Sequence, residues 1–159
     1  MRVAILTVSD KGSIGQREDT SGAYLKQAML DLGAEIVAAE IVADDYEAIR
    51  AKLIIYADIK EVDLVLTTGG TGLSLRDVTP EATIEVINRP APGIAEALRQ
   101  KSLEITPQAM LSRAAAGQRD KTLIINLPGS LKAVREQIAV LLPVLPHALE
   151  MVAGQGHGD

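Results

Sequence analysis

The sequence predicts an α/β fold, a mostly parallel β-sheet with helices on both faces, and two observations favour it. Apolar runs that are too short for helices alternate with longer segments in which apolar residues recur at helical spacing. In addition, the 159 residues include no Phe and no Trp, so the 47% hydrophobic residues are mainly Ala, Val, Ile and Leu. Such a composition suits parallel strands that are buried by helices.

In the first half of the chain, strands and helices are expected to alternate. The expected strands cover Arg2–Val8, Ala34–Val42 and Val62–Leu66. The first helix is expected from Thr20 or Ser21 to Leu32, ended by Gly33, and the second covers Tyr46–Tyr56. A polar loop, 9–15, is expected between the first strand and the first helix. The order strand, helix, strand, helix, strand indicates parallel strands with right-handed crossovers.

The stretch from Leu64 to Ala82 organises the chain. A buried strand leads into Gly69-Gly70-Thr71-Gly72, where the backbone can turn sharply and expose successive N–H groups. Thr79 and Pro80 then predict a helix start, with Thr79 as the N-cap and Pro80 in the first helical position. A strand, a glycine-rich loop, a charged segment and a helix in this order are typical of an anion site at the carboxyl end of a sheet.

The second half predicts further helices and one more buried strand. Helices are expected over Pro80–Asn88, Ile94–Leu103 and Pro107–Leu111, with a chain break over Pro90–Gly93. The segment Ser112–Gly117 could include a short strand, and a buried strand is expected over Thr122–Asn126. The last helical region covers Leu131–Val152 and is expected to be interrupted at Pro143 and Pro146. We therefore expect a single domain over 1–153 and a flexible tail over 154–159.

Composition excludes several functions. The net charge of −5 and the scarcity of aromatic residues argue against nucleic-acid binding. Without cysteine there is neither a disulfide framework nor thiolate chemistry. The longest apolar stretch, Ile138 to Leu145, is too short to span a membrane, and Met1 leads straight into a strand rather than a signal peptide. A cytoplasmic protein that does not engage membranes is expected.

The candidate site lies where four expected strands end. Ser9-Asp10, Asp44-Asp45, the 69–77 loop and Asn126–Gly129 should share one edge of the parallel sheet, where open α/β folds bind ligands. Any one of these loops could be an ordinary turn, but two glycine-rich loops with carboxylates on one edge are harder to explain in that way.

Known catalytic patterns narrow the chemistry. Neither a dinucleotide fingerprint nor a Gly-Lys-Ser/Thr loop is present, and no Ser–His pair stands out. The remaining carboxylates and backbone amides suit Mg²⁺ and a polyphosphate, with Asp44 and Asp77 as candidates. The alternatives are that Asp44 caps the following helix and that Asp77 is a surface charge.

Specific sequence segments favour a functional role for Asp44 and Asp77 over these alternatives. Thr67 to Pro80 (TTGGTGLSLRDVTP), Thr106 to Gly117 (TPQAMLSRAAAG) and Leu123 to Gly129 (LIINLPG) strongly resemble the MogA/MoaB family of molybdenum-cofactor proteins, which includes the adenylyltransferase domain of gephyrin. Ile5 to Asp10 (ILTVSD) and Thr20-Ser21-Gly22 match as well, so the resemblance covers nearly the whole chain. It implies a three-layer α/β domain that assembles as a homotrimer, for which small helix-face residues such as Ala95, Ala97 and Leu98 could supply contacts.

The resemblance also implies an activity, the Mg²⁺-dependent transfer of AMP from ATP to the terminal phosphate of molybdopterin with release of pyrophosphate. It places catalysis and metal binding on Asp44 and Asp77. Nucleotide contacts fall on Ser9, Gly69, Gly70, Thr71 and Gly72, and molybdopterin contacts on Ser112, Asn126, Pro128 and Gly129. Arg76, Arg113 and Lys132 are candidates for charge neutralisation, and hand-over of the product to a molybdate-insertion protein would follow.

Two departures keep an alternative open. Val42-Ala43 precedes Asp44 where adenylyltransferases usually have a proline, and Ser130-Leu131 follows the NLPG segment where many have a proline at the second position. Ser130 and the Thr20-Ser21-Gly22 region lean towards the MoaB branch, some of whose members are non-catalytic binders or scaffolds. The intact Asp44 and RDVTP segment favour an active transferase.

Overall fold

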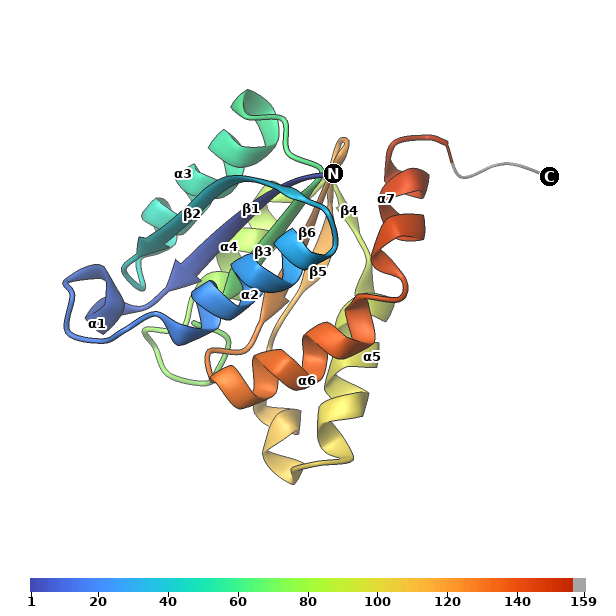
Figure 1. Ribbon diagram of the computed structural model, residues 1–159. Coiled ribbons are helices and arrows are strands. Elements are labelled where there is room, and N and C mark those ends of the chain that lie inside the picture. The colour runs from blue at the N-terminus through green and yellow to red at the C-terminus, as the bar shows by residue number, and fades with distance from the viewer. Residues whose placement is uncertain (156–159) are drawn as a thin grey trace.

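A six-stranded sheet runs through the computed structural model, which describes residues 1–155 (Figure 1). The strand order is β2-β1-β3-β6-β5-β4. The strands are β1 (Arg2–Val8), β2 (Glu35–Val42), β3 (Leu64–Thr68), β4 (Arg89–Pro90), β5 (Ala116–Arg119) and β6 (Thr122–Leu127). The β1, β2, β3 and β6 strands are parallel to their neighbours in this group, whereas β5 is antiparallel to both β6 and β4. The predicted mostly parallel sheet is confirmed.

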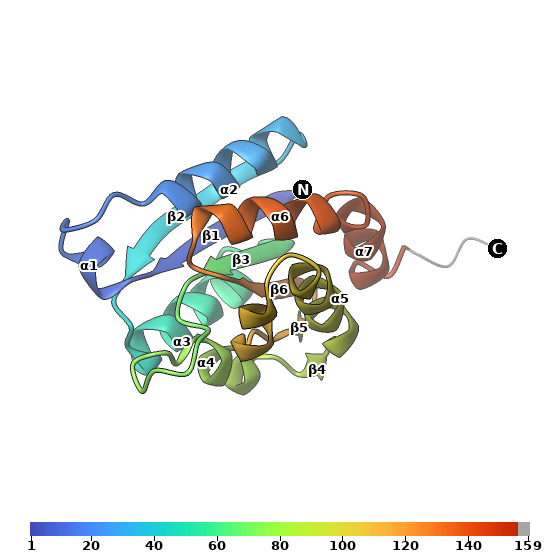
Figure 2. The same ribbon diagram turned by 90° about the horizontal axis from the view of Figure 1, so that it is seen from below.

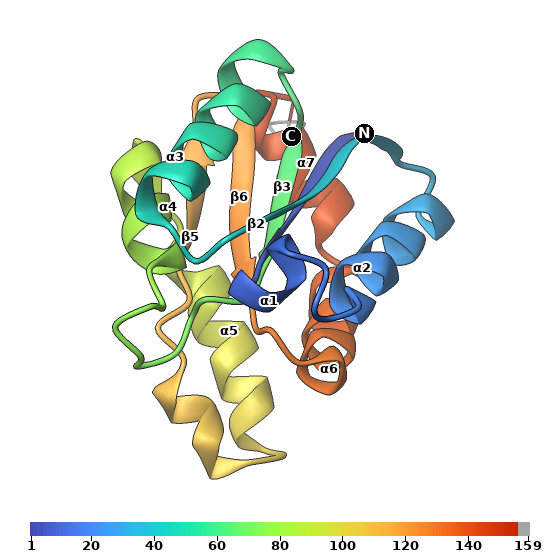
Figure 3. The same cartoon turned by 90° about the vertical axis from the view of Figure 1, so that its left-hand side faces the viewer.

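Helices cover both faces of the sheet, which makes the fold three-layered. One face is covered by α3 (Tyr46–Ile54), its π-helical continuation η1 (Ile55–Ile59) and α4 (Thr79–Val86). The other face is covered by α2 (Thr20–Asp31), α5 (Pro92–Leu103), α6 (Leu131–Leu141) and α7 (Leu145–Val152). In Figure 3, α3 and α4 lie to the left of the strands, and α2 and α6 to the right. Two short helices, α1 (Asp10–Ser13) and the 3₁₀ helix η2 (Pro107–Leu111), complete the fold.

The alternation of side chains along β1 separates the core into two parts. Val3 and Ile5 belong to the cluster that α2 and α6 cover, whereas Ala4, Leu6 and Val8 belong to the cluster that α3 and α4 cover. Successive residues of a strand point to opposite faces, so an apolar run without alternation is buried on both sides. The largely aliphatic strands thus require the helices on both faces.

Two helix starts differ from the expectation. Residues 10–13, expected within a loop, form the single turn α1, because the Ser9 hydroxyl accepts a bond from the Gly12 N–H and caps it. Thr79 is the first helical residue of α4 rather than its N-cap, a position that Val78 occupies. The Thr79 hydroxyl instead donates to the carbonyl of Gly69 at 3.0 Å, which fixes the glycine loop.

The prolines account for the other differences. Within the expected chain break at 90–93, Pro90 ends the edge strand β4, where its missing N–H is tolerated. Pro92 and Gly93 already belong to α5, expected only from Ile94, because proline is favourable in the first turn of a helix. Pro143 does separate α6 from α7, but Pro146 lies in the first turn of α7 and does not interrupt it. Of the tail expected to be flexible, 156–159 lie outside the described residues. Among residues 1–155, no helix combines the length and apolarity needed to cross a bilayer.

Candidate active site

The carboxyl ends of the parallel strands surround a cavity of about 490 Å³. Its walls come from the residues that follow β1, β2, β3 and β6, together with the segment 17–21 that enters α2. In Figures 1 and 2, the α1 turn and the loop before α4 lie at the same, left-hand end of the strands. The predicted meeting of the four strand-end loops at one edge is therefore confirmed.

Asp44 enters the cavity from the end of β2. Its neighbour Asp45, not Asp44, caps α3 by accepting a bond from the Glu47 N–H, so the capping alternative for Asp44 is wrong. One carboxylate oxygen of Asp44, Oδ2, accepts a bond from the Asp10 N–H at 3.0 Å. Burial raises the pKa of Asp44 above its ordinary value, and the negative charges of Asp10 and Asp77 add to the increase.

Asp77 reaches the same cavity from the loop between β3 and α4. Its Oδ2 accepts a bond from the Ser74 N–H at 3.1 Å. Arg113 holds this loop from the outside, because its guanidinium donates to the carbonyls of Gly72 and Asp77, both at 2.7 Å, and pairs with Glu81. Arg113, a candidate for charge neutralisation from the sequence, is thus occupied by the protein itself.

The glycine loop allows the β3 end to approach its surroundings closely. Gly69 and Gly70 have φ values of +98° and +69°, in the left-handed region. A Cβ on Gly70 would lie 2.3 Å from the Thr79 hydroxyl oxygen and 3.2 Å from Oδ1 of Asp44. Glycine is therefore required at this point for both the backbone conformation and the space beside the Asp44 carboxylate.

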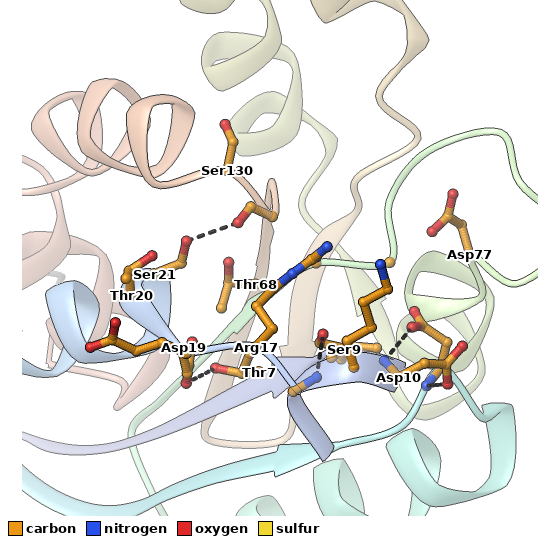
Figure 4. Close-up of a pocket in the computed structure, with 18 residues that line it drawn as sticks. Thr7, Ser9, Asp10, Arg17, Asp19, Thr20, Ser21, Thr68, Asp77 and Ser130 are labelled. Atoms are coloured by element: carbon orange, nitrogen blue, oxygen red, sulfur yellow. Dashed lines mark hydrogen bonds between the residues drawn. The ribbon is translucent and has the colours of Figure 1, made fainter. Parts of the chain in front are cut away.

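Basic and hydroxyl side chains complete the walls. Lys11 and Arg17 line the cavity, and Figure 4 shows Arg17 extending between Asp10 and Asp77 on one side and Ser21 on the other. The sequence reasoning missed both cations, because Lys11 and Arg17 belong to a polar segment in which nothing distinguishes them from solvated charges. Their only signal was their place in the segment that joins the first strand to the first long helix.

The far side of the cavity is built from two helix N-termini. Asp19 caps α2 by accepting a bond from the Gly22 N–H, and Ser130 caps α6 by accepting one from the Ala133 N–H. The Ser21 hydroxyl donates to the carbonyl of Gly129 at 2.8 Å and joins the two helix starts. Helix N-termini favour anions. At α2 the Asp19 carboxylate already takes that place, so the α6 N-terminus, capped by the neutral Ser130 hydroxyl, is the part of this side that suits a negatively charged ligand.

Comparison with known proteins places the chain in a family. The family described as "Probable molybdopterin binding domain" matches residues 4–147. The chain belongs to this family. The molybdopterin adenylyltransferase of Helicobacter pylori strain J99 is 42% identical over 156 residues, which cover 97% of this chain and 89% of that protein.

Relatives with other names are also similar to this chain. Molybdenum cofactor biosynthesis protein B of Escherichia coli K12 is 42% identical over 135 residues, which cover 84% of this chain and 78% of that protein. The crystal structure of the molybdopterin biosynthesis enzyme MoaB from Thermus thermophilus shares 50% identity with a TM-score of 0.90 and covers 96% of both chains. The predicted family and the three-layer fold are confirmed.

In this member of the family, the residues expected in the site divide into two groups. The cavity brings together Ser9, Asp44, Gly69, Gly70, Asp77 and Gly129. Thr71, Gly72, Ser112, Asn126 and Pro128 do not line it. The carbonyl of Pro128 accepts a bond from the Thr68 hydroxyl at 2.6 Å, and the Ser112 hydroxyl accepts one from the Ala114 N–H at 3.3 Å.

Asn126 is part of the scaffold beneath the site. Only 1% of it is exposed, and its amide donates to the hydroxyls of Thr67 and Thr83 while its carbonyl accepts a bond from the Ala115 N–H. All its polar atoms are thus bonded within the protein, and any contribution to ligand binding has to come through the loops that it holds.

The carboxylates fit a magnesium ion in chemistry and in number. Oδ1 of Asp44 accepts no hydrogen bond from residues 1–155, and Asp77 shares the cavity. Within the same residues, no group of three or more His, Cys, Asp or Glu side chains could hold a metal ion by itself. Mg²⁺ usually takes one or two carboxylates and completes its shell with water and substrate phosphates, so Asp44 and Asp77 suffice for a metal that arrives with a nucleotide.

Proposed function

We propose that this protein is a molybdopterin adenylyltransferase, which transfers AMP from ATP to the terminal phosphate of molybdopterin and releases pyrophosphate. The activity named for the Helicobacter pylori relative, 42% identical over nearly the whole chain, supports it. The structural observation that carries it is the meeting of two carboxylates, Asp44 and Asp77, with the Gly69-Gly70 loop and two basic side chains in one cavity.

This residue inventory suits the reaction. An oxygen of the molybdopterin phosphate attacks the α-phosphorus of ATP, the bond from that phosphorus to the bridging oxygen of pyrophosphate breaks, and pyrophosphate leaves. The attacking phosphate is largely dianionic at neutral pH because its second pKa is about 6. It needs no strong general base, and the cavity indeed offers neither histidine nor cysteine. The protein's task is to bring two polyanions together.

Asp44 and Asp77 would hold the Mg²⁺ that accompanies ATP. The metal, when bound, supplies neutralisation of the negative charge on the phosphates. We assign Lys11 and Arg17 the same role from the protein side, and Ser9, Gly69 and Gly70, with Thr71 and Gly72 behind them, to the nucleotide. Ser9, Lys11, Arg17, Gly69 and Gly70 line the cavity together with the two carboxylates, whereas Thr71 and Gly72 lie outside its lining.

We place molybdopterin on the opposite side, where Gly129 and Ser130 lie beside the N-termini of α2 and α6. The anion preference of the α6 N-terminus suits the terminal phosphate of the pterin. Pro128 and Ser112 remain assigned to molybdopterin through the family resemblance, with Asn126 as the support beneath them. A cytoplasmic biosynthetic role, with hand-over of the adenylylated product to a molybdate-insertion protein, is part of the same proposal.

We further propose a homotrimer, but on other grounds than the α5 face. Ala95 and Leu98 are buried in the core of the single chain, and of the three residues expected to supply contacts only Ala97 is exposed. The family resemblance still supports assembly. So does a row of exposed apolar side chains at the end of α5 and along η2, formed by Leu103, Ile105, Met110 and Leu111.

The experiment is a direct transfer assay. The protein is incubated with molybdopterin, Mg²⁺ and ATP labelled at the α-phosphate. The label transferred to the pterin and the pyrophosphate released, which carries no label, are both quantified. We expect labelled adenylylated molybdopterin and an equal amount of pyrophosphate, both dependent on Mg²⁺. Molybdopterin binding without transfer would overturn the proposal in favour of a non-catalytic, MoaB-like binder or scaffold.

A further inference from the structure

Asp10 has a carboxylate that the proposed reaction does not use, although it lies at the cavity wall. It forms a bidentate pair with Arg76, with 2.7 Å from Nη2 to Oδ1 and 3.1 Å from Nε to Oδ2. Its Oδ1 also accepts a bond from the Asp44 N–H at 3.0 Å. Because both oxygens of Asp10 already accept bonds from the protein, this carboxylate is poorly suited to serve as a third metal ligand.

The backbone of Asp10 closes a ring with Asp44. The Asp10 N–H donates to Oδ2 of Asp44 at 3.0 Å, while the Asp44 N–H donates to Asp10. These two bonds fix the side chain of Asp44 at one oxygen and leave Oδ1, beside Gly70, without a protein donor in the described chain. The ring therefore orients Asp44 with one oxygen available to a ligand.

Arg76 connects this ring to the second carboxylate, because it directly precedes Asp77. The loop that carries them is held on its outer side by Arg113, through the carbonyls of Gly72 and Asp77. On the side of α1, the Arg76–Asp10 pair is the side-chain connection that joins it to the turn after β1. The pair spans 66 positions of sequence and links the elements that carry Asp44 and Asp77.

We infer that Asp10 and Arg76 are positioning residues, a latch that holds the Asp77 loop against the Asp44 ring and so sets the two carboxylates in place for one metal–nucleotide complex. The inference rests on the proposed function for the identity of the ligand. The latch itself is a property of the protein.

The exposure of the Asp10–Arg76 pair indicates which properties of the protein should change when the pair is removed. The side chains of Arg76 and Asp10 are 63% and 45% exposed, and ion pairs as exposed as this one contribute little to folding stability because water screens them. Removing the latch should leave global stability nearly unchanged and instead loosen the loop and weaken metal binding. Residues that orient metal ligands typically change metal affinity by roughly 10- to 100-fold.

The test compares Asp10→Asn and Arg76→Gln with Asp58→Asn. Asp10→Asn keeps an acceptor for the Asp44 N–H but removes the charge. Asp58→Asn is a matched control, because Asp58 forms a bidentate pair of the same kind with Arg119, at 2.9 and 2.8 Å, and does not line the cavity. The readouts are amide hydrogen exchange of the 71–78 segment, Mn²⁺ affinity by electron paramagnetic resonance with a non-hydrolysable ATP analogue, and the melting temperature.

We expect faster exchange of 71–78 and an about tenfold weaker Mn²⁺ affinity in both latch variants, with melting temperatures close to that of the parent and no such changes in Asp58→Asn. The double variant should be no worse than either single variant, because both act through one pair. Exchange or Mn²⁺ affinity equal to the parent, or additive effects in the double variant, would overturn the latch. If the parent binds no Mn²⁺–nucleotide, the proposed function fails, and the exchange measurement alone then decides the latch.

Discussion

Asp10 and Asp44 hold each other reciprocally, since the N–H of each donates to the carboxylate of the other at 3.0 Å. The two residues follow adjacent parallel strands, β1 and β2, whose carboxyl ends lie side by side. The site is therefore assembled by backbone groups of the strand ends, and the acidic side chains are oriented before any ligand arrives. Several expected outcomes depend on this arrangement.

Replacing Asp44 or Asp77 by Asn should separate catalysis from folding. Each change keeps the size of the side chain and removes one negative charge from the proposed metal site. We expect AMP transfer in single-turnover measurements to fall by roughly 10²–10³-fold, while molybdopterin affinity, measured by calorimetry, changes far less. Unchanged transfer in both variants would contradict the assignment of these carboxylates.

Gly70 and Gly72 should respond differently to a side chain. Gly70→Ala forces a non-glycine residue to φ +69° and places the new Cβ 2.3 Å from the Thr79 hydroxyl, so we expect a loss of stability of about 1–3 kcal/mol in urea unfolding.

Gly72, by contrast, has no positive φ, and its Cβ would lie 2.9 Å from Oδ2 of Asp77. Gly72→Val should therefore weaken nucleotide binding, measured by calorimetry, with the fold intact.

A control for the glycine series is Gly93→Ala in α5, where a Cβ would meet no atom within 4 Å. Alanine is the better helix former by about 0.5–1 kcal/mol, and this variant should match or exceed the parent in stability and bind ATP normally. Normal ATP affinity in Gly72→Val would show that the loop is only a turn.

Lys11 and Arg17 should contribute to nucleotide affinity. A hydrogen bond to a charged group is worth about 1.5–3 kcal/mol, so Lys11→Ala and Arg17→Ala should each weaken ATP binding by roughly 10- to 100-fold. The loss should shrink at high salt because both side chains are exposed. Lys26→Ala on α2, outside the cavity wall, serves as the control, and an equal loss there would point to a general charge effect.

The Glu40 carboxylate should make stability dependent on pH. Lys52 donates to it at 2.5 Å and the buried Tyr56 hydroxyl at 2.8 Å, and the bond from Lys52 above all holds the pKa of Glu40 below its usual value. A carboxylate with a lowered pKa in the folded state stabilises that state above the unfolded pKa, and the contribution disappears as pH falls through the folded pKa.

Glu40→Gln removes the charge and keeps an acceptor for Tyr56. We expect the variant to be about 0.2–1 kcal/mol less stable at pH 7, because the ion pair is partly exposed. Measured by urea unfolding, the difference from the parent should begin to shrink as pH falls through the unfolded pKa of Glu, about 4.3, and should vanish below the lower folded pKa of Glu40. A difference that persists unchanged at low pH would mean that packing, not charge, is responsible.

Assembly is tested by light scattering at micromolar concentration. We expect the mass of a homotrimer for the parent, because the exposed apolar row at Leu103, Ile105, Met110 and Leu111 is better buried than solvated. Met110→Glu should weaken the assembly, whereas Ile59→Glu, at an exposed apolar residue in η1, should leave it intact. A stable monomeric parent would contradict the prediction.

The amino-acid sequence by itself determined the architecture. Aliphatic runs without alternation require strands that are buried on both faces, and helical segments between them require parallel strands whose carboxyl ends meet at one edge. Because these are local patterns with short periods, they placed the loops of Ser9, Asp44, Gly69 and Asp77 on the same side of the sheet, as the structure confirms. Their place after the strands made Asp44 and Asp77 candidates among 21 acidic residues, and the family resemblance then favoured a role in the site over capping or a surface charge.

Only the tertiary structure decided what each polar group does. It assigned helix capping to Asp45 rather than Asp44, turned Arg113 and Asn126 into supports, and brought Lys11 and Arg17 to the cavity. The Asp10–Asp44 and Asp10–Arg76 contacts join residues 34 and 66 positions apart. The geometry of a hydrogen bond depends on a few tenths of an ångström, and such distances follow from strand order, register and loop path, which no local pattern of residues contains.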